Sequence, residues 1–151
     1  LGFFKHKFNV NCHIDKAWEF YTHINHLAII TPRQLDLAIL DTTDLKFIEG
    51  TEVWIQGKIL LFKKEWHSRI TQVRPYEYVD EMLSGPFKRW KHLHIFRYDV
   101  QLNQTEIADE VEFQLPYGAM GRIFEGLTNI ELKRIFEHRK KATTKALEVS
   151  D

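Results

Sequence analysis

Two histidines, His92 and His94, lie two residues apart between the aromatic residues Trp90 and Phe96. In a β-strand every second side chain points to the same face, so these four side chains are expected to share one face of a sheet. If the Gly-Pro pair that precedes them forms a short hairpin turn, Asp80 lies opposite His92 on the neighbouring strand. The sequence therefore predicts imidazoles and a carboxylate close together on an otherwise apolar wall.

We call Asp80, His92, His94 and Asp109, which is expected nearby, the polar cluster. Buried charges are costly unless they are paired, so Asp80 and His92 could simply satisfy each other and hold the hairpin. A few convergent polar groups in an apolar pocket are also the usual form of a ligand site. A histidine there could act as a general acid or base, and the catalytic candidates are then His92, His94 and Asp80.

The same residues could supply two histidines and one carboxylate to zinc or iron. Two histidines on an aromatic strand face are weak evidence for a metal site, however. Cys12 is the only cysteine, so no multi-cysteine zinc site and no intramolecular disulfide can form. We therefore predict no metal and no other cofactor.

The elements that position the polar cluster follow one another in a distinctive order. Asp15 is a plausible N-cap for a first helix, and Pro32 ends a second one. We expect an α+β fold in which a curved antiparallel sheet of six or seven strands packs on a long C-terminal helix. The predicted elements are a strand at Phe3–Cys12, short helices at Lys16–His23 and Asn25–Ile30, strands at Leu35–Leu40, Thr51–Leu61, Lys64–Val73, Tyr76–Leu83, Phe87–Val100 and Thr105–Leu115, and a helix at Arg122–Leu147.

Three segments carry a family resemblance. Residues 80–96 match the pattern D-x-x-x-x-G-P-[FY]-x-x-W-x-H-x-H-x-F, residues 105–118 match T-x-x-x-D-x-V-x-[YF]-x-[LA]-P-x-G, and residues 135–139 match I-F-x-[YH]-R. These patterns resemble a bacterial and archaeal cyclase/dehydrase-like branch of the helix-grip START-like superfamily, to which the birch pollen allergen, lipid-transfer START domains and polyketide cyclases belong. The resemblance implies a helix-grip fold and a ligand-binding role. Met82 departs from the pattern, since a polar residue is common there.

A cavity between the sheet and the C-terminal helix is the expected binding site. We predict that it holds a small hydrophobic molecule, such as a lipid, an isoprenoid or an aromatic, polyketide-like metabolite. The alternatives are a cyclase or dehydratase that uses His/Asp acid–base chemistry on such a molecule, and an interaction domain without a small-molecule site. The predicted lining residues are Trp66, Tyr78, Asp80, Met82, Trp90, His92, His94, Phe96, Asp109, Val111, Phe113, Phe124 and Leu127.

Composition narrows the class of protein. The 151 residues suit one domain over 1–151, and a hydrophobic fraction of 44% excludes disorder throughout. A formal net charge of +0 gives no support for nucleic-acid binding. No apolar run is long enough for membrane insertion, and the lone cysteine fits a cytoplasmic location. A homodimer is left open.

The remaining ionisable side chains are expected at the surface. Arg122 and Arg139 fall on the last helix, where a solvated side chain is the expected state. No partner is evident in the sequence for the six histidines outside the polar cluster. These are His6, His13, His23, His26, His67 and His138.

Overall fold

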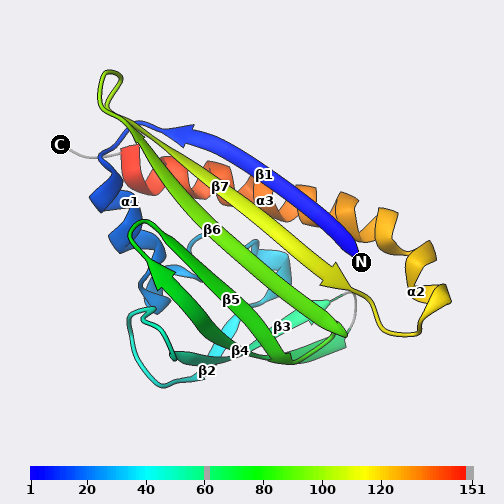
Figure 1. The fold of residues 1–151 in the computed structure, drawn as a ribbon. Helices are drawn as coiled ribbons and strands as arrows, with labels where there is room; N and C mark the ends of the chain where they lie inside the picture. The colour runs from blue at the N-terminus through cyan, green and yellow to red at the C-terminus, as the bar shows by residue number, and fades with distance from the viewer. Residues whose placement is uncertain (60–61, 149–151) are drawn as a thin grey trace.

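A computed structural model describes residues 1–59 and 62–148, and these residues contain one seven-stranded antiparallel sheet. The strand order is β1-β7-β6-β5-β4-β3-β2, so the first and last strands of the chain are neighbours. Figure 1 shows the sheet beside the long helix α3. The α+β prediction is confirmed. The strands are β1 (Gly2–Val10), β2 (Ala38–Thr42), β3 (Glu52–Ile59), β4 (Phe62–Arg74), β5 (Glu77–Ser84), β6 (Arg89–Asp99) and β7 (Gln104–Gln114), and the long helix is α3 (Glu125–Glu148).

The strands predicted from residue alternation are all present, with shifted ends. The largest shift concerns the strand predicted at Leu35–Leu40, which is observed as β2 at Ala38–Thr42. The chain first makes a 3-10 turn, η2 (Arg33–Leu35), which Asp36 ends with a left-handed φ of 45°. Of the strand predicted up to Leu61, the last two residues lie outside the described residues.

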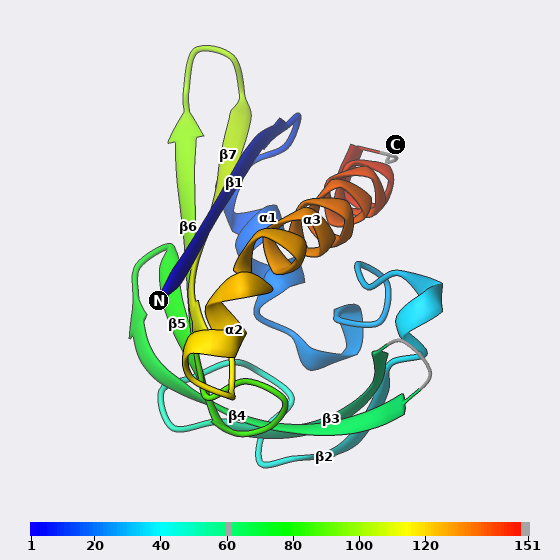
Figure 2. The same ribbon diagram turned by 90° about the vertical axis from the view of Figure 1, so that its right-hand side faces the viewer.

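Two short helical segments follow β1. Helix α1 (Ile14–Tyr21) is capped by His13, whose Nδ1 accepts a hydrogen bond from the backbone N–H of Asp15. The prediction of Asp15 as N-cap is therefore wrong, because an imidazole nitrogen fills the acceptor role that usually belongs to a side-chain oxygen. The second predicted helix is a single 3-10 turn, η1 (Ile24–His26). Figure 2 shows the chain after α1 lying above β3 and β4.

The last helix differs from its prediction at its beginning. A separate short helix, α2 (Ala119–Ile123), precedes α3, and Phe124 and Leu127 are 49% and 62% exposed. Figure 1 shows the reason, since α2 and the first turn of α3 extend beyond the N-terminal end of β1 and have no sheet beneath them. Leu132 and Phe136 are the first large apolar side chains of α3 to be buried. Among the described residues, no helix is long and apolar enough to span a membrane.

The concave face of the sheet carries the core. Large side chains of β1, β6 and β7 alternate into it and pack against α1 and α3. The tightest pair is Gly2 opposite Phe113, where a Cβ on the glycine would stand 2.3 Å from the phenyl ring. The C-terminal end of α3 is held by a 2.6 Å hydrogen bond between the hydroxyls of Tyr21 and Thr143. Helices α1 and α3 are therefore joined at this end of the molecule.

Candidate functional site

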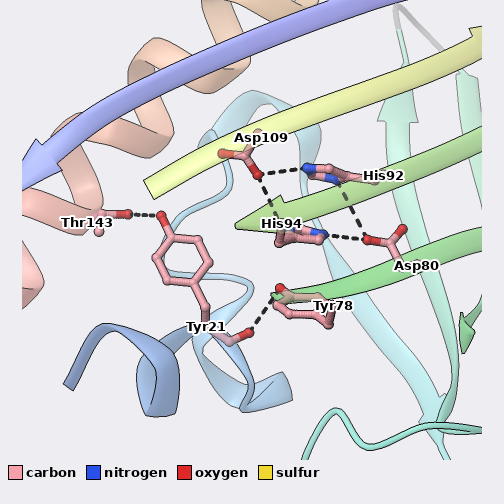
Figure 3. Close-up of polar contacts among 7 residues, drawn as sticks. All are labelled: Tyr21, Tyr78, Asp80, His92, His94, Asp109 and Thr143. Carbon is pink, nitrogen blue, oxygen red and sulfur yellow. Dashed lines mark hydrogen bonds and ion pairs between the residues drawn. The ribbon is translucent and has the colours of Figure 1, made fainter. Parts of the chain in front are cut away.

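Strands β5, β6 and β7 bring the four residues of the polar cluster together. Asp80 lies opposite His92, and His94 lies opposite Asp109, which confirms the predicted hairpin register. The shortest contacts nevertheless run diagonally, with 2.6 Å between His94 Nε2 and Asp80 Oδ2 and 2.7 Å between His92 Nε2 and Asp109 Oδ1. Two longer contacts, His92 Nδ1 to Asp80 Oδ2 at 3.7 Å and His94 Nδ1 to Asp109 Oδ1 at 3.3 Å, close a ring (Figure 3). Each carboxylate therefore contacts both imidazoles.

Burial and the neighbouring charges together set the charge states of the polar cluster. Burial by itself would raise the pKa of Asp109, but Arg139 and the two imidazoles hold that pKa well below the usual carboxyl range. Burial also opposes a proton on His94, yet contact with both carboxylates raises the pKa of His94 above its ordinary value. Burial and the adjacent His94 lower the pKa of His92. The cluster therefore favours a proton on His94 and a neutral His92.

Arg139 lines the cavity and is placed differently from its prediction. The sequence favoured a solvated side chain, but the guanidinium lies 5.2 Å from the ring centre of Tyr21 and 5.3 Å from that of Phe136. Its Nε is buried and has no hydrogen-bond partner among the described residues. Burial alone would lower the pKa of Arg139, but Asp109 and Tyr21 raise it, so the guanidinium stays charged. The one sequence feature that singled out Arg139 is its position at the end of the pattern I-F-x-[YH]-R over residues 135–139.

A cavity of about 180 Å³ opens beside the polar cluster. Its walls come from α1, the segment after it, and strands β3 to β6, and α3 contributes only Arg139 among the described residues. The cavity was expected between the sheet and the C-terminal helix, so its position differs from the prediction. Its lining comprises Phe20, Tyr21, His23, His26, Leu27, Ile30, Phe47, Val53, Ile55, Trp66, Ser68, Ile70, Tyr78, Asp80, Trp90, His92, His94 and Arg139.

Six of the predicted lining residues do line the cavity, and all six belong to β4, β5 or β6. They are Trp66, Tyr78, Asp80, Trp90, His92 and His94. The other seven do not line it. Phe96, Val111 and Phe113 are packed in the core, and Asp109 lies behind the imidazoles at 1% exposure. Met82 packs half-buried in the core beside them, while Phe124 and Leu127 are exposed.

Several histidines outside the polar cluster have partners, so the prediction of unpartnered surface residues is wrong for them. The Nε2 of His6 lies 3.1 Å from Glu137 Oε1. His67 stacks on Trp54 and contacts Glu52 at 2.9 Å. Two others, His23 and His26, line the cavity. The segment after α1 was missed as a wall because its short turns carry no long periodic pattern.

Comparison with known proteins supports the fold. No protein-family model matches the chain, and no curated protein matches it by sequence. A START superfamily protein from Mycobacterium smegmatis superposes with a TM-score of 0.71 at 10% identity, over 98% of both chains. A protein from Thermus thermophilus gives a TM-score of 0.76 at 10% identity, over 96% of both chains.

Norcoclaurine synthase from Thalictrum flavum, solved in complex with dopamine and hydroxybenzaldehyde, gives a TM-score of 0.70 at 16% identity over 99% of this chain and 88% of its own. Identities this low carry information about the fold alone. The chain has the helix-grip, START-like fold, and the resemblance seen in the sequence is confirmed at that level.

Proposed function

We propose that the protein binds a small, largely apolar molecule in the cavity beside the polar cluster. The observation that carries the proposal is the composition of the cavity, whose walls are mostly apolar and aromatic while its charged groups gather at Asp80, His92, His94 and Arg139. An apolar pocket with a few convergent polar groups is the usual form of a small-molecule site. The existence of this cavity weighs against an interaction domain with a filled core.

The size of the cavity selects among the predicted ligand classes. Ligand pockets commonly measure about 300–1,000 Å³, and an engineered cavity of about 150 Å³ in another protein holds one benzene molecule. A volume of about 180 Å³ therefore suits a single aromatic ring better than a lipid chain. Trp66 and Trp90, with their ring centres 5.1 Å apart, supply aromatic surface to the same wall.

The polar cluster gives such a ring its orientation. Asp80 lines the cavity with its side chain 20% exposed, so a ligand hydroxyl can donate a hydrogen bond to the carboxylate there. Arg139, which lies on α3, adds a positive charge to the cavity lining. The proposal agrees with one structural neighbour, since norcoclaurine synthase was solved with dopamine and hydroxybenzaldehyde, both of which are single-ring molecules with polar groups. We place the protein in the cytoplasm as part of this proposal.

Phenol and benzene test the proposal, because they differ only by one hydroxyl. Titration of each, followed by tryptophan fluorescence, to which Trp66 and Trp90 on the cavity wall contribute, should show saturable binding, with phenol binding more tightly. Ser68→Leu fills the cavity and should weaken both ligands at least tenfold. Ser84→Leu makes the same change at an exposed position of β5 and should leave both affinities unchanged. Absence of saturable binding, or equal weakening by the two variants, would overturn the proposal.

A second candidate function is acid–base catalysis on the same kind of molecule. The observation in its favour is the 2.6 Å contact between His94 Nε2 and Asp80 Oδ2 on the cavity wall, which fits a histidine oriented by a carboxylate. Incubation with dopamine and hydroxybenzaldehyde, followed by mass spectrometry, separates the two functions. A new product that forms with the wild type and not with His94→Gln would favour the enzyme, whereas unchanged compounds favour a binding protein.

A further inference from the structure

The ring nitrogens of the polar cluster are arranged in two sets. His92 Nδ1 and His94 Nε2 both face Oδ2 of Asp80, at 3.7 Å and 2.6 Å. The other two nitrogens, His92 Nε2 and His94 Nδ1, both face Oδ1 of Asp109, at 2.7 Å and 3.3 Å. Figure 3 shows the two imidazoles between the two carboxylates. One nitrogen of each ring is therefore directed at the cavity side, where Asp80 lies, and the other at the buried side.

This arrangement matches the two shells of a metal site. One ligand atom from each of Asp80, His92 and His94 lies within 4.8 Å of the others, and all three residues line the cavity. Metal-binding histidines almost always give their second nitrogen to a carboxylate or carbonyl that fixes the tautomer and the ring orientation. Asp109, which is 1% exposed, occupies that position for His92, whose Nε2 lies 2.7 Å from Oδ1 of Asp109. The same oxygen lies 3.3 Å from Nδ1 of His94, which makes no hydrogen bond among the described residues. If Asp80 and His92 served only to hold the hairpin together, a second carboxylate beside the histidines would not be needed.

We propose that Asp80, His92 and His94 bind a divalent transition-metal ion, with zinc or ferrous iron as the chemical class and with a coordination position left open toward the cavity. Two histidines and one carboxylate are a donor set that both ions accept. Asp109 is a positioning residue, because it reaches the ion only through the imidazoles. This inference departs from the absence of a metal predicted from the sequence, where spacing alone did not reveal Asp109.

A proton occupies the site in the absence of an ion. A carboxylate oxygen 2.6 Å from an imidazole nitrogen requires a hydrogen between them, and this hydrogen lies between His94 and Asp80. The ion replaces that proton, which is released to solvent, and bonds of about 2.0–2.2 Å to each ligand move Asp80 slightly outward. Asp80 can move because its side chain is 20% exposed, against 5% for each histidine. The charge of the ion is offset by the carboxylates of Asp80 and Asp109.

The metal site deepens the proposed function, because an open position on the ion would receive the oxygen of a bound phenol-like ligand. Metal binding can be tested without any organic ligand, so an experiment can contradict the metal site without contradicting the proposed binding of a small apolar molecule, and the reverse. Loss of metal binding with phenol binding intact would leave the proposed function standing. Loss of phenol binding with metal binding intact would remove the proposed function and leave the metal site.

The experiment is a cobalt titration of chelator-treated protein, with zinc as the competitor. The wild type should bind one Co²⁺ and show the visible absorption bands of cobalt with four or five ligands. Binding should release protons and raise the melting temperature. Zn²⁺ should displace the cobalt. His92→Gln, His94→Gln and Asp80→Asn should abolish the bands. His67→Gln, which replaces a histidine outside the cavity, should leave them unchanged.

Asp109→Asn separates positioning from ligation. It should keep the cobalt bands but weaken the affinity by about 10–100-fold, as expected for the loss of a residue that orients a ligand. Circular dichroism identifies any variant that does not fold, and Asp80→Asn, at the most exposed ligand, is the least demanding for folding. No cobalt bands in the wild type at millimolar metal, or equal affinity in the wild type and the folded cluster variants, would overturn the metal site.

Discussion

The two halves of the concave face are built from the same alternating residue pattern but are occupied differently. On β1 and β7 the inward side chains are packed in the core, with Phe113 and Val10 at 0% exposure, whereas Trp90, His92 and His94 of β6 line the cavity. On β3, β4 and β5 several inward side chains, including Trp66 and Ser68, stay half-buried around the cavity. We call these the filled half and the hollow half. The polar cluster lies on the border between them.

The difference arises from what covers each half. The filled half is covered by α1 and by the part of α3 from Leu132 onward, which present large side chains in a regular row. The hollow half is covered by the turns after α1, where the chain has no long apolar row to insert (Figure 2). An alternating strand therefore encodes an inward face, and the covering element decides whether that face becomes core or binding site.

The largest expected effect lies in the filled half. Phe113→Ala removes a fully buried ring and should lower the free energy of unfolding by about 3–5 kcal/mol, because a cavity remains where the ring packed against Gly2. Urea unfolding measures the loss. Phenol affinity, determined under conditions where the variant is folded, should stay within about twofold of wild type, as expected for a residue outside the hollow half. A loss of less than about 1 kcal/mol would show that the two halves are not packed differently.

An intermediate effect is expected at the border, where the two histidines have opposite pKa shifts. The raised pKa of His94 stabilises the folded state fully below about pH 6.5, and this contribution disappears as the pH rises through the raised value. Relative to His94→Gln, the wild type should therefore lose free energy of unfolding on going from pH 6 to alkaline pH. The titratable groups that face His94 are Asp80, Asp109, His92 and Tyr78, whose ring stacks on the imidazole with 4.0 Å between the ring centres.

His92→Gln provides the matched control for that pH profile. The pKa of His92 is lowered by burial and by His94, so its contribution is present above about pH 6.5 and is lost as the pH falls. The two variants should therefore deviate from the wild type in opposite directions in urea unfolding between pH 5 and pH 9. Parallel profiles would contradict the assignment of the proton to His94.

The smallest expected effect lies in the hollow half. Ser68→Val adds methyl groups beside an existing cavity and should change the free energy of unfolding by about 0.5 kcal/mol or less. Val111→Ile adds a single methylene in the filled half and should cost about 1–3 kcal/mol, because no space receives it. Thermal unfolding of both variants makes the comparison. Equal losses would mean that the cavity is not available to side chains.

The local pattern of the sequence determined where the strands lie and which of their side chains share a face. It also predicted the part of the site formed by Asp80 and His92. Alternation from Trp90 to Phe96, with the short turn before it, was sufficient to place Asp80 opposite His92. The long C-terminal helix was predicted as well, although its beginning differs from the prediction. Both features depend on neighbouring residues along the chain, so they can be predicted without knowledge of the packing.

Only the tertiary structure decided which inward side chains meet a cavity and which pairs share a proton. Phe124 and Leu127 fit a helical stripe, but the helix passes the end of the sheet there and leaves them exposed. The diagonal pairing of His94 with Asp80, and the approach of Arg139, depend on side-chain rotamers and on where α3 crosses the sheet. Such long-range placement is set by how whole elements pack, and no local spacing in the sequence contains it.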